Sequence, residues 1–269
     1  MEHRVKFSPI PFRKRVKSML RVDFRRMFKS RTFYVLVLCA LLLPVIMLVM
    51  LSMMDGSVSV DPQTGVETVI EGPENTWQAI GALPHAPAAG GMDVLSMCNI
   101  NMVVPGVAIF LCLFMSEDFR SGYAKNLLTV RAGKSDYVIS KTLAGLTCGI
   151  LMLLAYFMGA LAGGAVAGLS FDLHTLSAAN IVLCMLAKIC LIPVFISIFV
   201  LISVAAKQRA WLALCGSLGG GMLLFMMVPA LTPLNSTMMN VLLCLAGSVM
   251  FAIGLGAVSN LVLKKTSLV

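Results

Sequence analysis

Six long apolar runs dominate this sequence, and they leave few folds open to it. A helix needs about 20 apolar residues to cross the roughly 30 Å hydrocarbon core of a bilayer. We assign spans to residues 33–54, 94–115, 137–163, 178–204, 210–231 and 238–262. The composition agrees, because 59% of the 269 residues are hydrophobic and 12% are charged, whereas soluble domains are about 25% charged. The chain is therefore predicted to be an all-α, polytopic membrane protein with six transmembrane helices.

Lysine and arginine residues are sorted among the gaps between these runs. Eleven of the 21 precede residue 32. The other basic gaps hold Arg120, Lys125, Arg131, Lys134, Lys207 and Arg209, and the tail at 264–269 holds Lys264 and Lys265. The gap at 55–93 and the gaps near Asp172 and Pro233 hold none. Short cytoplasmic loops are enriched in Lys and Arg, so we expect both termini in the cytoplasm. We attribute the net charge of +9 to topology and not to nucleic-acid binding.

The first segment, residues 1–32, is predicted to contain a basic amphipathic helix. Its apolar residues recur at helical spacing, and basic residues fill most of the remaining surface. The apolar set is Val16, Met19, Leu20, Phe24, Met27 and Phe28. Such a helix lies in the headgroup boundary with its cations on anionic lipid, which makes Arg21, Phe24, Arg25 and Phe28 the predicted membrane-interface residues. The simpler alternative is a segment that only sets topology.

The gap between the second and third runs is too polar to span the bilayer but has helical periodicity. Phe119, Tyr123, Leu127 and Val130 fall on one face. We place Glu117 and Asp118 in the first turn, where acidic residues favour the helix dipole. The pattern predicts a short cytoplasmic helix over 117–131 that inserts into a partner's groove and passes on a rigid-body motion.

This stretch resembles the coupling helix of type-two permeases of ATP-binding cassette (ABC) transporters. The resemblance lies in the order of a basic amphipathic helix, a span, an external loop, a span and an acidic-Gly-Lys-Leu-Leu stretch. The matching positions are Glu117, Arg120, Gly122, Lys125, Leu127 and Leu128, with Ser140-Lys141 following. It implies that this helix, with Tyr123 on its apolar face, docks on an ATPase subunit. It also implies a transporter of two permease chains, identical or different, and two ATPase chains that hold ATP and Mg.

No phosphate-binding loop G-x-x-x-x-G-K-[ST] occurs in this sequence. We therefore expect no cofactor on this chain, with ATP hydrolysis on a separate subunit. The resemblance implies an exporter in a bacterial cell membrane, with a hydrophobic or amphipathic substrate such as a peptide, an antimicrobial or a lipid.

One charged residue, Lys188, lies about ten residues inside the fourth run. A charge at that depth costs about 2.5–3.5 kcal/mol, so its ammonium either faces protein or water or extends outward along a lipid face. Asn99 and Asn101 in the second run, or Asp93 and Asp172 at the outer rim, are its candidate partners. Lys188, Asn99 and Asn101 are therefore the candidate residues of a translocation pathway.

The loop at 55–93 is rich in Pro and Gly, which predicts an irregular external loop with a short strand near Val66–Ile70. It is either a plain surface loop or a cap over a substrate exit. In the third run, Gly159, Gly163, Gly164 and Gly168 have the spacing of close helix contacts, within the chain or across a dimer. The eight cysteines all fall in apolar runs, so we expect buried thiols without disulfides or a zinc site.

Other function classes fit less well. The three histidines lie outside the runs and no run holds two carboxylates, which disfavours an intramembrane protease. A secondary transporter or channel usually carries buried acids at the midplane, and this sequence predicts none there. It remains the main alternative, followed by a membrane anchor for signalling partners.

Overall fold

The computed structural model describes residues 11–60, 67–69, 72–81, 99–130, 134–173, 176–225 and 227–265. These parts are helical apart from one short hairpin. The α-helices are α1 (Phe12–Met27), α2 (Arg31–Met53), α4 (Val103–Arg120), α5 (Tyr123–Val130), α6 (Lys134–Ala167), α7 (Ala178–Ala206), α8 (Ala210–Phe225), α9 (Val228–Leu231) and α10 (Met238–Lys265). Two 3-10 helices, η1 (Thr76–Ala79) and η2 (Ile100–Met102), and two strands, β1 (Val58–Val60) and β2 (Glu67–Val69), complete the described elements.

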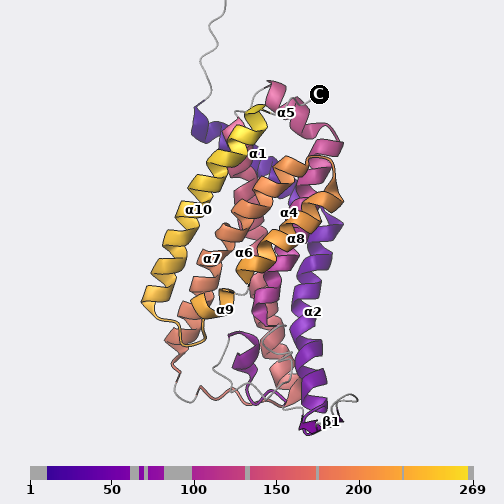
Figure 1. Ribbon diagram of the computed structural model, residues 1–269, viewed down its shortest axis with the longest axis vertical. Helices are drawn as coiled ribbons and strands as arrows, with labels where there is room; N and C mark the ends of the chain where they lie inside the picture. Colours follow the sequence, from indigo (N-terminus) through magenta and orange to yellow (C-terminus); the bar gives the residue numbers. More distant parts are fainter. Residues whose placement is uncertain are drawn as a thin grey trace, which may run out of the picture.

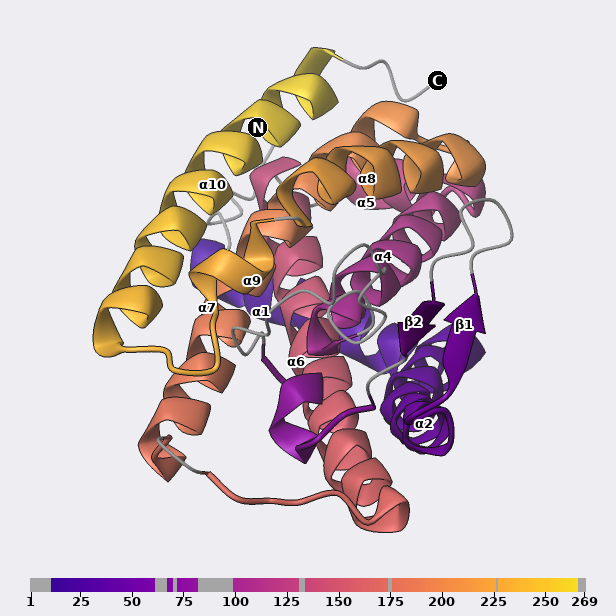
Figure 2. The ribbon, with the colours of Figure 1, turned by 60° about the horizontal axis from the view of Figure 1, so that its bottom comes forward.

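The long helices run roughly along one axis, and each reverses the direction of the one before it (Figure 1). We call the end that carries α1, α5 and the last turns of α10 the α1 end, and the opposite end, which carries β1 and β2, the hairpin end. Viewed obliquely from the hairpin end, α2 and α10 lie at opposite edges, with α6 and α7 between them (Figure 2). The described parts of both termini therefore lie at the same end, as expected for an even number of crossings.

Five helices are long and apolar enough to cross a membrane, and they coincide with five of the six predicted spans. The exception is the predicted span 210–231. Helix α8 has 16 residues and ends at Phe225, and α9 begins only at Val228. Pro229 explains the break, because a proline ring clashes with the carbonyl of the residue four positions earlier, which is Phe225.

The second span begins later than expected. The predicted range starts at residue 94, whereas the described helix starts with η2 at Ile100 and becomes α-helical at Val103. Pro105 falls in the first turn of α4, where a proline is well tolerated because the N–H that it lacks would have no partner within the helix. Asn99 and Asn101 consequently lie at the start of this helix and not within it.

The predicted single helix over 117–131 is wrong in its bounds. Helix α4 continues to Arg120, and α5 begins at Tyr123. Gly122, with φ of +73°, makes the break between them, because this backbone conformation favours glycine. Glu117 and Asp118 therefore occupy the last turns of α4 and not the first turn of a separate helix.

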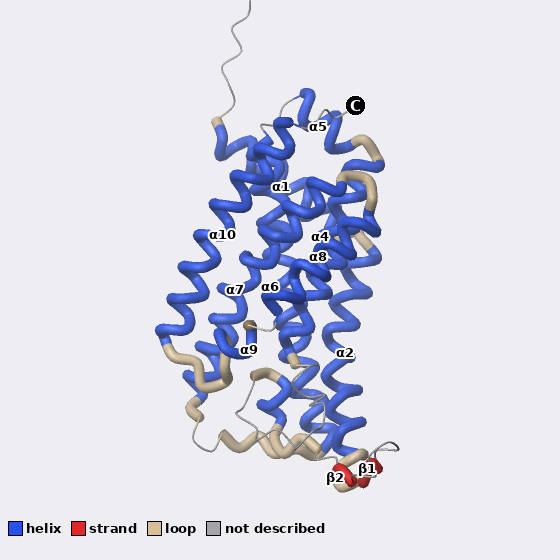
Figure 3. The backbone as a smooth tube through the Cα atoms, viewed as in Figure 1, coloured by secondary structure: helices blue, strands red, loops and turns tan. Residues whose placement is uncertain are grey.

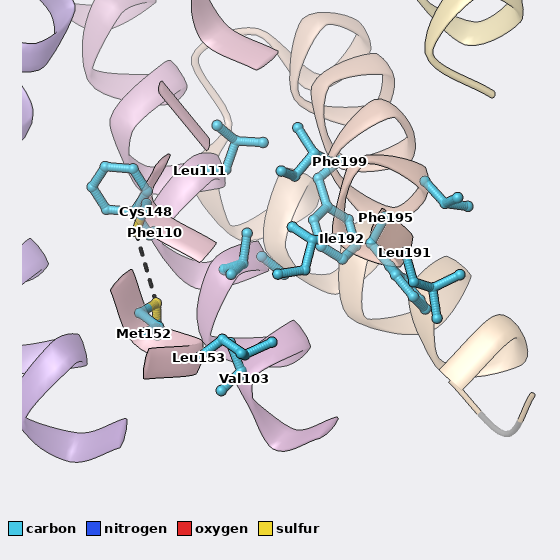
Figure 4. Close-up of a cluster of buried hydrophobic side chains, with 14 of the residues drawn as sticks. Val103, Phe110, Leu111, Cys148, Met152, Leu153, Leu191, Ile192, Phe195 and Phe199 are labelled. Carbon is cyan, nitrogen blue, oxygen red and sulfur yellow. Dashed lines mark hydrogen bonds between the residues drawn. The ribbon is translucent and has the colours of Figure 1, made fainter. Parts of the chain in front are cut away.

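The core lies where α4, α6 and α7 meet. Phe110, Leu111, Met152, Ile192 and Phe199 are among its buried side chains, and Figure 4 shows apolar side chains from these three helices converging. Helices α2 and α10, by contrast, leave most of their length exposed, as expected for helices whose outer faces meet lipid.

The glycines of α6 bring α2 into close contact. A Cβ on Gly159 would lie 2.0 Å from the carbonyl oxygen of Leu41, and one on Gly163 would lie 2.8 Å from Cα of Val45. Gly159 and Gly163 therefore make close helix contacts within the chain. Gly168 has a different role: its φ of +70° ends α6, and Leu169 N donates to the carbonyl of Gly164 in a Schellman motif.

The described part of the 55–93 loop folds back on the hairpin end. Strands β1 and β2 pair antiparallel there (Figure 3), which confirms the strand expected near 66–70. Asn75 Nδ2 donates to the carbonyl of Asp172 at 2.6 Å, and Trp77 Nε1 donates to that of Phe171 at 3.0 Å. The segment 72–81 is thereby fastened to the connection between α6 and α7.

Candidate functional site

The predicted amphipathic helix is present as α1, but its inner face carries an acidic residue. Met19, Asp23 and Met27 recur every four residues and are all buried. Helix α1 packs mainly on α6, so its inner face meets protein. Because a carboxylate without a partner is costly to bury, Asp23 requires cations or donors from the neighbouring helices.

Those partners form a cluster of four charges from three helices. Lys141 Nζ of α6 lies 2.7 Å from Asp23 Oδ1 and 2.6 Å from Asp118 Oδ2 of α4. Arg26 of α1 lies 2.5 Å from Asp118 Oδ1. The side chains of Asp23, Asp118 and Lys141 are 0% exposed and that of Arg26 is 29% exposed. We call Asp23, Arg26, Asp118 and Lys141 the ionic cluster, and its two carboxylates balance its two cations.

Hydroxyl groups and aromatic rings complete the surroundings of the ionic cluster. Ser140 Oγ donates to Asp23 Oδ2 at 2.6 Å, and Tyr137 Oη donates to Asp118 Oδ2 at 3.2 Å. The ammonium of Lys141 lies 4.2 Å from the ring centroid of Phe114. Cations are attracted to the faces of aromatic rings, so this ring adds to the ion pairs.

Tyr123, the first residue of α5, joins the coupling-helix candidate to the ionic cluster. Its ring lies 4.5 Å from the guanidinium carbon of Arg26. Burial, with the negative charges of Asp23 and Asp118, raises the pKa of the Tyr123 phenol. Burial alone would lower the pKa of Arg26, but Asp118, Asp23 and Tyr123 together outweigh it, and the pKa of the guanidinium is raised. At neutral pH this contact therefore joins a neutral ring to a charged guanidinium.

Two further contacts fasten the same end. Arg15 Nε of α1 lies 2.9 Å from Asp136 Oδ2 at the start of α6. Lys134 Nζ donates to the carbonyl of Leu263 near the end of α10 at 2.9 Å. Asp23, Asp118 and Asp136 are all buried, and Glu117 is the exposed acid among the described residues of this end. The exposed charged side chains at the α1 end are consequently basic apart from Glu117, among the described residues.

The predicted coupling residues lie together at the α1 end. Glu117, Arg120 and Lys125 are exposed, whereas Gly122 and Tyr123 are half-buried. The remaining two are Leu127, half-buried, and Leu128, whose backbone lies in α5. Glu117 and Arg120 belong to α4 and Lys125 to α5, so the exposed charges of this set lie on both sides of Gly122, whereas the Tyr123 ring contacts Arg26 of α1.

The predicted membrane-interface residues fall on the outer side of α1. Arg21, Arg25 and Phe28 are exposed and Phe24 is half-buried. Part of the apolar face of α1, which was expected to lie against lipid, packs on α6 instead.

Sequence reasoning did not identify the ionic cluster. Ser140 and Lys141 were noted only for their resemblance to a motif, and Asp118 only for its supposed place in a helix dipole. One signal was available: Asp23 is four residues from both Met19 and Met27, which places an acid on an apolar stripe.

The second site surrounds Lys188, whose side chain is buried. Its Nζ donates to Asn101 Oδ1 at 2.8 Å, to Thr232 Oγ1 at 3.0 Å and to the Thr232 carbonyl at 3.4 Å. Asn101 was a predicted partner, whereas Thr232 was missed because it follows the unexpected break between α8 and α9. The lipid-facing alternative is therefore wrong for Lys188.

The other predicted partners of Lys188 divide as follows. Asn99 is buried and its Oδ1 accepts from Asn101 N at 3.0 Å, so it supports Asn101. Asp172 is exposed, and its carbonyl accepts the hydrogen bond from Asn75 Nδ2 described above. Asp93 lies outside the described residues.

No group of His, Cys, Asp or Glu side chains suited to a metal ion occurs within the described ranges, and the seven cysteines in those ranges are free thiols. No protein-family model, curated protein or solved structure matches this chain.

Proposed function

We propose that this chain is the membrane permease subunit of an ATP-driven exporter of the ABC type. One observation carries the proposal: a short helix, α5, lies between two long apolar helices at the end of the bundle that holds the basic residues. Basic loops mark the cytoplasmic side, so α5 would face the cytoplasm, where a soluble ATPase would reach it.

The ionic cluster supports this role mechanically. A docked partner can drive a transporter only if its docking helix is rigidly joined to the spans. Tyr123 contacts Arg26, and Arg26 is paired with Asp118 of α4, which shares the ionic cluster with Lys141 of α6. A displacement of α5 would therefore be passed to α1, α4 and α6 together.

The proposal includes six membrane crossings with both termini in the cytoplasm. Helix α8 would enter from the α1 end, and α9 would complete the fifth crossing after the break before Pro229. Irregular backbone at membrane depth is tolerated where it is buried in protein, and Thr232, just after α9, is buried against Lys188.

The proposed mechanism is alternating access. Two ATPase subunits with ATP and Mg would close together, draw the α5 helices of two permease chains with them, and tilt the spans. The exposed basic side of α1, with Arg21 and Arg25, would rest on anionic headgroups. The cargo would be hydrophobic or amphipathic, as the resemblance to type-two ABC permeases implies.

Co-purification with ABC-type ATPase subunits of the same organism, expressed one at a time with this chain, tests the proposal. Glu117→Arg with Arg120→Glu reverses two exposed charges beside α5, and Gly122→Trp forces a side chain onto a φ of +73°. We expect both variants to lose the ATPase while retaining the membrane fold.

Glu74→Arg is the matched control, because Glu74 is an exposed acid at the hairpin end. It should retain the ATPase in full. Association that survives both changes around α5 would contradict the coupling role.

A secondary transporter or channel is the second candidate, and Lys188 is the observation that favours it. Secondary transporters place charged residues where interrupted helices meet near the midplane, and Lys188 joins the start of α4 to the residue that follows α9. Transport by this chain alone in liposomes, without an ATPase, would establish that alternative.

A further inference from the structure

The hydrogen bonds around Lys188 match an ammonium group. An ammonium has three N–H donors, and its Nζ has three acceptors within reach, Asn101 Oδ1 and the two oxygens of Thr232. The Thr232 hydroxyl already donates its proton to the carbonyl of Val228 at 2.8 Å. Its oxygen is therefore left as an acceptor for Lys188.

Charge is not balanced at this site in the way it is in the ionic cluster. All three acceptors of Lys188 are neutral, and no ion pair to Lys188 occurs within the described ranges. A buried charge is normally paired. Lys188 thus has its hydrogen bonds satisfied but lacks a counter-charge from the described parts of the chain.

Asn101 adds an unused donor beside this cation. Its Oδ1 accepts from Lys188, and its Nδ2, which is also buried, has no acceptor among the described residues. A buried amide N–H without an acceptor is costly. An anionic group placed beside both residues would satisfy the amide and balance the ammonium at once.

Space for such a group lies against the same two residues. A cavity of about 20 Å³ is lined by Asn101 and Lys188 and otherwise by apolar side chains, enough for about one water-sized group. Val103, Leu153, Leu191, Ile192 and Phe195 form much of its wall, and Figure 4 shows them beside one another. The cavity therefore offers one free donor group, the Asn101 amide, beside the charge of the Lys188 ammonium, in surroundings that are otherwise apolar.

We infer that Lys188 and Asn101 form a binding site for a single anionic group. The group is either a free monovalent anion or the acidic end of an amphipathic molecule whose remainder requires the helices to open. The amphipathic ligand rests on the proposed function, because it would identify the transported substrate as an acidic amphiphile. Binding of the anion itself does not depend on an ATPase.

Thermal unfolding of the purified full chain in nanodiscs of neutral phosphatidylcholine tests the site. Chloride is compared with gluconate, which is too large for the cavity, at equal ionic strength. Octanoate is compared with octylammonium in gluconate buffer. Ligands that bind only the folded state raise the unfolding midpoint, and we expect a rise of about 2–4 °C. A rise with chloride assigns a free ion, and a rise with octanoate alone assigns an acidic amphiphile.

Two variants make the result specific to this site. Asn101→Asp places a carboxylate where an oxygen now lies 2.8 Å from Lys188 Nζ, so the chain supplies its own anion. We expect this variant to be as stable as the wild type in chloride and insensitive to added anions. Lys188→Met should also be insensitive to anions.

Asp93 lies outside the described residues and was a predicted partner of Lys188, so Asp93→Asn tests whether it is the counter-ion. An anion-insensitive wild type would overturn the inference, and anion sensitivity that appears only in Asp93→Asn would assign Asp93 as the counter-ion. An anion effect that persists in Lys188→Met would overturn it too. ATPase association is measured separately, so these results leave the coupling proposal intact.

Discussion

Removal of the Lys141 ammonium should unfold the α1 end more than any exposed substitution. Lys141→Met leaves Asp23 buried with the hydrogen bond from Ser140 but without its cation. Asp118 keeps Arg26 and the hydrogen bond from Tyr137. Breaking a buried ion pair from one side costs about 3–5 kcal/mol, and we expect this loss in the free energy of unfolding.

The double variant Lys141→Met with Asp23→Asn separates charge from packing. Lys141→Met leaves the ionic cluster with a net charge of −1, and Asp23→Asn restores neutrality. We therefore expect the double variant to be more stable than Lys141→Met alone, because substitutions at residues in direct contact do not simply add. Arg120→Met, an exposed cation at the end of α4, should change stability by less than about 0.5 kcal/mol.

Two measurements report on this cycle. Reversible unfolding in mixed micelles of dodecyl maltoside and sodium dodecyl sulfate, followed by tryptophan fluorescence, gives the free energies. Limited trypsin digestion reports locally, because α1 is rich in Lys and Arg and is cleaved faster once it leaves α6. A loss below about 1 kcal/mol for Lys141→Met, or strictly additive effects in the double variant, would refute the view of the ionic cluster as a coupled unit.

Three further predictions concern other contacts. Gly159→Ala should lower the free energy of unfolding by at least about 1–3 kcal/mol, since its Cβ would meet the Leu41 carbonyl oxygen at 2.0 Å. Thermal unfolding measures this loss, and Gly254→Ala, where a Cβ would face open space, should leave the midpoint unchanged. Trp77→Ala removes a hydrogen bond and an edge-on contact with Phe171, so the Thr76 amide should exchange about 10- to 30-fold faster, whereas Trp211→Ala on the lipid side should leave that exchange unchanged. Folding raises the pKa of Tyr123, so the stability that this residue contributes is complete below a pH of about 10 and is lost as the pH rises toward the folded pKa. The thermal unfolding midpoint should therefore fall more steeply above a pH of about 10 in the wild type than in Tyr123→Phe. Equal slopes would contradict the contact between Tyr123 and Arg26.

Much of the architecture could be predicted because lipid imposes a simple rule on sequence. Apolar length and basic gaps predicted the helical class and located five of the six spans. The errors occurred where one residue overrides periodicity. Pro229 ends α8, and Gly122 separates α5 from α4. Because the residues on both sides of each break have helical periodicity, the sequence predicted one continuous helix in each case.

The two sites were harder to predict, since their residues are far apart in sequence. Lys188 stood out because a cation is rare in an apolar run, and Asn101 was among the partners considered. Thr232 could not be paired with it until the turn after α9 was known. Asp23 and Lys141 each resemble ordinary members of a basic segment and of a span entrance, and only the docking of α1 on α6 brings them together.

The contact between α2 and α6 limits how this protein can change shape. Where main chain rests directly on main chain, as at Gly159 and Leu41, there are no flexible side chains to absorb sliding of one helix past the other. The two helices would therefore have to move together as one rigid pair.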